Sequence, residues 1–129
     1  MKRHVDFLSW LHLAWGFIFL LVALAGGALA AGALAISTGT SPVAVRSPMA
    51  AQLTALTLAA LSFIALAWAI LHLWIGRALG TYRPWARTLA LGLAVVNMVL
   101  LPFGTALGAY ACWVLLKEEG RRVFESRVH

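Results

Sequence analysis

Charged side chains are scarce in this sequence, and their scarcity decides the class of protein. Only 11% of the residues are Asp, Glu, Lys or Arg, while 63% are hydrophobic. A soluble domain carries about 25% charged residues, so this chain could not cover a globular surface in water. We therefore expect an integral membrane protein, and at 129 residues we expect residues 1–129 to form a single membrane domain.

Other absences exclude several kinds of site. The single cysteine, Cys112, excludes an internal disulfide and a multi-cysteine metal site. There is no nucleotide-binding glycine loop, zinc-protease His-Glu pattern or nucleophile elbow. The acidic residues all lie outside the apolar runs, so the buried carboxylate typical of proton-coupled exporters is missing; they are Asp6, Glu118, Glu119 and Glu125. We expect no enzymatic activity and no metal.

Four apolar runs can be delimited. A bilayer core of about 30 Å needs roughly 20 helical residues, and the runs cover about 7–36, 50–75, 85–101 and 103–116, followed by a cytoplasmic tail at 117–129. Pro84 suits the first position of the third helix, and Pro102 with Gly104 makes the turn after it. The pattern predicts an all-α polytopic protein with four transmembrane helices in an antiparallel up-down bundle. Because the last two runs are short, a re-entrant hairpin remains an alternative.

The basic residues predict how the chain is threaded. Cytoplasmic loops accumulate Lys and Arg, and only Arg46 lies in a segment that must face outside. The other nine can share one side: Lys2, Arg3, Arg77, Arg83, Arg87, Lys117, Arg121, Arg122 and Arg127. Both termini are therefore expected in the cytoplasm. The net charge of +6 flanks the apolar runs, which indicates contact with anionic lipid headgroups, not nucleic acid.

Small residues recur at every fourth position of three runs. In lipid, such residues let helix backbones approach closely. The stripes are Ala23, Gly27, Ala31 and Ala35; Ala51, Ala55 and Ala59, then Ala65 and Ala69; and Gly104, Gly108 and Cys112. They predict helix packing within the bundle, a homo-oligomer or larger membrane complex, or both. Asn97 is expected to face the neighbourhood of Gly108 and to bond across the hairpin.

Two histidines are the candidates for chemistry. His12 and His72 are the only ionisable residues well inside the runs, at similar depth on neighbouring antiparallel spans, close to Trp15 and Trp68. An intramembrane ionisable residue is a functional hypothesis by default. Two facing imidazoles could ligate haem b or bind a quinone. Both are shallow, however, so we favour interfacial or weak ligand-contact roles and expect no cofactor.

The second half of the chain resembles a recurring pattern of small bacterial membrane proteins. The segment Arg83-Pro84-Trp85-Ala86-Arg87 leads to a Pro-x-Gly-Thr hairpin at Pro102 and a Gly-x-Tyr-x-x-Trp helix ending near Trp113. This resemblance covers about a third of the chain. It implies a four-helix protein of the bacterial inner membrane and no particular activity.

The function expected from the sequence is that of a non-enzymatic structural, accessory or assembly subunit. A small oligomeric transporter or channel is the first alternative. A haem- or quinone-binding redox subunit that uses His12 and His72 is the second.

Overall fold

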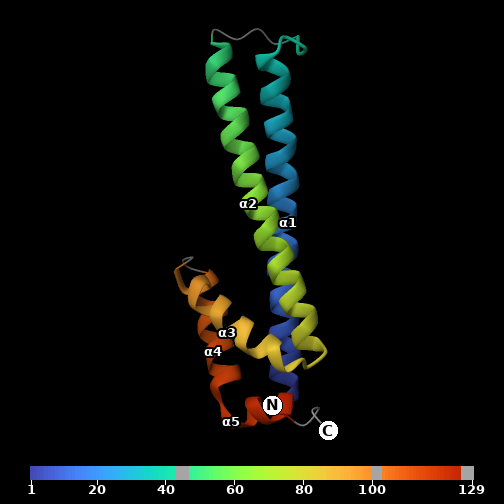
Figure 1. Cartoon of the computed structure of the whole chain (residues 1–129), viewed down its shortest axis with the longest axis vertical. Coiled ribbons are helices and arrows are strands. Elements are labelled where there is room, and N and C mark those ends of the chain that lie inside the picture. The colour runs from blue at the N-terminus through green and yellow to red at the C-terminus, as the bar shows by residue number, and fades with distance from the viewer. Residues whose placement is uncertain (43–46, 100–102, 126–129) are drawn as a thin grey trace. The chain divides into compact units, whose positions relative to one another are not determined.

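The computed structural model describes residues 1–42, 47–99 and 103–125, and within these ranges the regular structure is entirely helical. The helices are α1 (Lys2–Ser37), α2 (Pro48–Gly80), α3 (Pro84–Val99), α4 (Phe103–Leu116) and α5 (Glu118–Glu125) (Figure 1). The all-α prediction is confirmed. The predictions for Arg46, Pro102 and Arg127 lie outside the described residues.

The chain divides into two compact units. Met1–Trp15 and the residues from His72 onward form one, which we call the terminal unit; Gly16–Leu71 form the other, the central unit. Helices α1 and α2 each contribute to both units.

Two of the five helices are long and apolar enough to cross a membrane. Helix α1 has 36 residues and α2 has 33. Of their most apolar 18-residue windows, only 11% and 17% of the residues are buried, so most of their apolar surface is left for another apolar environment. Helices α3 and α4, with 16 and 14 residues, are about 24 and 21 Å long, which is less than the roughly 30 Å hydrocarbon core.

In the central unit, the face of α1 that contacts α2 contains Gly26 and Ala30. Each of these precedes by one residue a member of the predicted stripe, Gly27 and Ala31. A Cβ added at Gly26 would lie 2.3 Å from Ser62 Oγ, whereas no atom of the described residues lies within 4 Å of one at Gly27. Ala30 is buried and Ala31 is exposed. Of the two roles predicted for Gly27 and Ala31, packing within the described part of the chain is not seen at Gly27, and contact with a second subunit stays a prediction. A uniformly apolar helix gives no sequence signal that separates these two faces.

Helix α2 continues past Ile75, where its apolar run was expected to stop. At Gly76 the helix lies close against α1, because a Cβ there would meet Leu13 at 3.0 Å. The hydroxyl of Ser9 also donates to the Gly76 carbonyl at 2.7 Å, and these contacts with α1 hold this part of α2 in place. The connector to α3 is consequently only Thr81–Arg83.

A Schellman cap ends α2 and turns the chain. Tyr82 adopts φ 54°, a left-handed conformation that favours glycine. Its N–H donates to the Leu79 carbonyl at 3.0 Å, and the Arg83 N–H donates to the Ala78 carbonyl at 3.1 Å. The Tyr82 hydroxyl also donates to the Asp6 carboxylate, and this tie to α1 offsets the strain of about 1–2 kcal/mol.

Helices α3 and α4 form a tightly packed hairpin. A Cβ at Gly108 would lie only 2.4 Å from the carbonyl oxygen of Ala94, so the backbones approach as the Gly104–Gly108 stripe predicts, and Gly104 is buried beside it. Cys112, the third member of the predicted stripe, is only partly buried, and Ala111 occupies the interface instead. The facing stripe on α3, which the sequence analysis missed, consists of Ala86, Ala90 and Ala94, each fully buried.

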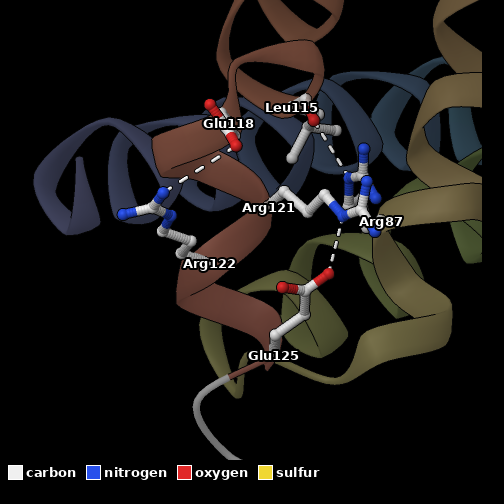
Figure 2. A network of polar contacts seen from close by, with 6 residues as sticks. All are labelled: Arg87, Leu115, Glu118, Arg121, Arg122 and Glu125. Atoms are coloured by element: carbon white, nitrogen blue, oxygen red, sulfur yellow. Dashed lines mark hydrogen bonds and ion pairs between the residues drawn. The ribbon is translucent and has the colours of Figure 1, made fainter.

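Helix α5 is a separate short helix after a break at Lys117, and polar contacts surround the corner (Figure 2). Arg87 Nε of α3 donates to the carbonyl of Leu115 at 3.0 Å. Within α5, Arg121 Nε donates to Glu125 at 2.6 Å and Arg122 pairs with Glu118 at 3.8 Å. The hydrogen bond and the charge of Glu125 raise the pKa of the Arg121 guanidinium.

Candidate functional site

The terminal unit brings His12 of α1 and His72 of α2 into direct contact. The imidazole rings stack with centroids 5.6 Å apart and an interplanar angle of 27°. Both residues have 0% exposure. They are therefore interior groups, and neither imidazole reaches the surface of the unit.

The hydrogen bonds fix the tautomers of both rings. His12 Nδ1 lies 3.0 Å from the Leu8 carbonyl oxygen, which can only accept, so Nδ1 carries a proton. A second proton on Nε2, which has no hydrogen-bond partner among the described residues, would leave a buried charge unpaired, so Nε2 is bare. The Asn97 side-chain amide donates to His72 Nε2 at 3.2 Å, so His72 Nε2 is also unprotonated. Both imidazoles are neutral, and α3 is tied to α2 by this hydrogen bond.

The hydrogen-bond partner that the structure shows for Asn97 lies on α2, not across the hairpin as predicted. Its amide contacts His72 of α2, and the residues that face Gly108 are Ala94 and Met98. In α3, Ala94 lies one turn before Asn97 on the same side of the helix, and Met98 directly follows Asn97. Asn97 thus ties the hairpin to another helix and does not bond across the hairpin.

Two polar atoms of this cluster have no hydrogen-bond partner among the described residues: His12 Nε2 and Asn97 Oδ1, both buried. Both are acceptors in the arrangement above. Each of these atoms could accept a hydrogen bond from a donor such as a hydroxyl group or a water molecule. A quinone carbonyl is itself an acceptor and does not match them.

The cluster does not fit haem either. Bis-histidine ligation needs a free nitrogen on each ring, directed at the iron, but His72 Nε2 already accepts from Asn97. Both rings are fully enclosed by protein. Within residues 1–42, 47–99 and 103–125, no group of three or more His, Cys, Asp or Glu could hold a metal ion.

The two tryptophans predicted beside the histidines belong to different units. Trp15 lies in the terminal unit and Trp68 in the central unit. Each is partly buried, and its indole nitrogen is inaccessible to solvent. The buried polar cluster of the terminal unit consists of His12, His72 and Asn97 together with Ser9.

A second hollow in the terminal unit was not predicted as a site. It measures about 260 Å³ and lies where α2 ends and α3 begins, lined by Trp74, Arg77, Ala78, Thr81, Arg83 and Trp85. The sequence contained a signal for it, because two Trp and two Arg fall within twelve residues. The sequence analysis uses the two arginines only to predict topology.

A third hollow, in the central unit, is almost entirely apolar. It measures about 450 Å³ and is lined by Ala30, Ala31, Leu34, Gln52, Ala55, Leu56 and Ala59. Gln52 alone brings a polar side chain, so this hollow offers hydrophobic contact and no chemistry.

Comparison with known proteins adds no further guide to the site. No family model matches the chain, and no curated protein or solved structure is similar to it.

Proposed function

We propose that this chain is a non-enzymatic structural or accessory subunit of the bacterial inner membrane. The observation that carries the proposal is the surface of α1 and α2, whose most apolar windows are only 11% and 17% buried. Helices of this length would anchor the chain and offer their sides to lipid or to the helices of other subunits. The interior of the terminal unit holds neutral, mutually engaged side chains, which suits a packing role better than catalysis.

The threading we propose has two full spans, α1 and α2, with both termini in the cytoplasm. Its basis is the placement of nine basic residues on one side. In this arrangement the α3–α4 hairpin enters the membrane from the cytoplasmic face and returns to it.

The hydrogen bond between His72 and Asn97 favours this re-entrant hairpin over four spans. From His72 to the end of α2 at Gly80 the helix rises about 12 Å, whereas from Pro84 to Asn97 α3 rises about 20 Å. Because the two side chains meet, α3 is strongly inclined to α2 and reaches only the level of His72.

Cysteine labelling tests the threading. In a Cys112→Ala background, Ser41→Cys should react with an impermeant maleimide added outside intact cells, and Glu119→Cys should react only after permeabilisation. Phe103→Cys, at the tip of the hairpin, should react in neither case. Labelling of Phe103→Cys from outside would support four spans instead, and labelling of Glu119→Cys in intact cells would reverse the topology.

The subunit role requires partner chains. Native mass spectrometry after extraction in a mild detergent should give a stoichiometric complex, either of copies of this chain or with other membrane proteins. A species with the mass of one chain at every detergent and protein concentration would refute the subunit role without affecting the threading. Flux of solutes through liposomes that contain the purified protein would favour the transporter alternative.

A further inference from the structure

We propose that the hollow between the end of α2 and the start of α3 binds a phosphate group, supplied by the headgroup of an anionic lipid of the cytoplasmic leaflet. This inference rests on the proposed membrane topology, which places the connector Thr81–Arg83 at the cytoplasmic headgroups. The proposal names phosphate-bearing headgroups as the ligands that bind this part of the protein.

The two arginines of the hollow are available to a ligand. Arg77 and Arg83 are exposed and line the hollow together. Within the described part of the chain, neither guanidinium has an ion-pair or hydrogen-bond partner, whereas Arg121 and Arg122 pair with glutamates. No Asp or Glu lines the hollow. Arginine binds phosphate through a planar set of donors that can form two hydrogen bonds at once.

The backbone around the hollow also suits an anion. The last carbonyls of α2 are engaged by its cap, since Arg77 O accepts from the Thr81 N–H, Ala78 O from Arg83 and Leu79 O from Tyr82. These hydrogen bonds weaken the negative end of the α2 dipole at the hollow, where the two arginines oppose what remains of it. Helix α3 begins at Pro84 on the rim, and the positive end of its dipole favours negative charge.

The aromatic walls place the hollow at the membrane interface. Trp74 and Trp85 contact each other with ring centroids 4.9 Å apart, and Trp74 is 55% exposed. Tryptophan rings concentrate at the level of lipid headgroups. The hollow of about 260 Å³ lies just below the roughly 300–1,000 Å³ of drug-sized ligand pockets, which suits a headgroup with its acyl chains outside.

Native mass spectrometry of the full-length protein in dodecyl maltoside can count retained lipids during titration. The probes are dioleoylphosphatidylglycerol, dioleoylphosphatidylcholine and inorganic phosphate. We expect preferential retention of phosphatidylglycerol, and roughly 25-fold weaker retention by the Arg77→Gln/Arg83→Gln variant, from about fivefold for each guanidinium. The matched control, Arg121→Gln/Arg122→Gln, removes the same charge from paired arginines and should change retention less than about threefold.

A second double variant guards against misfolding. Arg77→Lys/Arg83→Lys keeps both charges and should retain phosphatidylglycerol at an intermediate level, because lysine lacks the planar donor geometry. If inorganic phosphate competes at millimolar concentration, the phosphate site stands and its source is the free ion. Equal losses in the two glutamine variants, or equal retention of both lipids by the unaltered protein, would overturn the proposal while leaving the labelling results intact.

Discussion

The close backbone contact between α3 and α4 gives a sharp test of the packing. A Cβ at Gly108 would lie 2.4 Å from the carbonyl oxygen of Ala94 and 3.0 Å from Met98 Cγ. The methionine side chain can move, but the carbonyl is part of the α3 backbone. Gly108→Ala should therefore force α3 and α4 apart.

The size of the effect follows from this geometry. Carbon–oxygen contacts between packed helices normally measure about 3.3–3.6 Å, so the backbones must separate by about 1 Å. Overpacking of this kind typically costs about 1–3 kcal/mol of the free energy of unfolding. Gly92 is the matched control on the same hairpin, since nothing lies within 4 Å of its Cβ position. Gly92→Ala should stabilise α3 by about 0.5–1 kcal/mol.

Unfolding in mixed micelles of dodecyl maltoside and sodium dodecyl sulfate, followed by tryptophan fluorescence, would measure both variants. The two free energies of unfolding should differ by roughly 1.5–4 kcal/mol, with Gly108→Ala the less stable. If Gly108→Ala were as stable as Gly92→Ala, the close approach of α3 and α4 would be incorrect.

Two further pairs of variants test the interior with the same unfolding assay. His72→Phe leaves the Asn97 amide without its acceptor and should cost about 1–3 kcal/mol of the free energy of unfolding. His12→Phe loses the Nδ1–H bond to the Leu8 carbonyl, but that oxygen keeps its helix hydrogen bond and an aromatic ring is retained, so the loss should be less than about 1 kcal/mol. Equal losses would refute the assigned hydrogen bonds. Gly26→Leu should lower the free energy of unfolding because the new side chain would collide with α2, while Gly27→Leu should not. If Gly27→Leu were the less stable variant, the face of α1 predicted from the sequence would be the one that packs against α2.

The parts of the fold that the sequence predicted depend on local chemistry. Apolar runs of sufficient length predicted α1 and α2, and Pro84 marked the first residue of α3 because its ring fits that position. Gly108 signalled a close approach because only glycine leaves the space.

The parts that could not be predicted depend on tertiary contacts. The end of α2 was placed too early because Gly76 was interpreted as a stop, although it packs against Leu13. The left-handed cap residue of α2 is Tyr82, not a glycine, and its hydrogen bond to Asp6 of α1 holds it in place. The hydrogen bond between Asn97 and His72 depends on how α3 is tilted against α2. The spacing of apolar residues in the sequence contains no information about that tilt.

The hydrogen bond between His72 and Asn97 also has a consequence for synthesis at the ribosome. The two residues are 25 positions apart, and translation adds about 5–20 residues per second. For roughly 1–5 s, therefore, α2 exists without the amide that later binds its imidazole. During that interval His72 Nε2 lacks the amide donor that it has in the folded chain. Docking of the α3–α4 hairpin supplies that donor, so we expect it to be a late step in the assembly of the terminal unit.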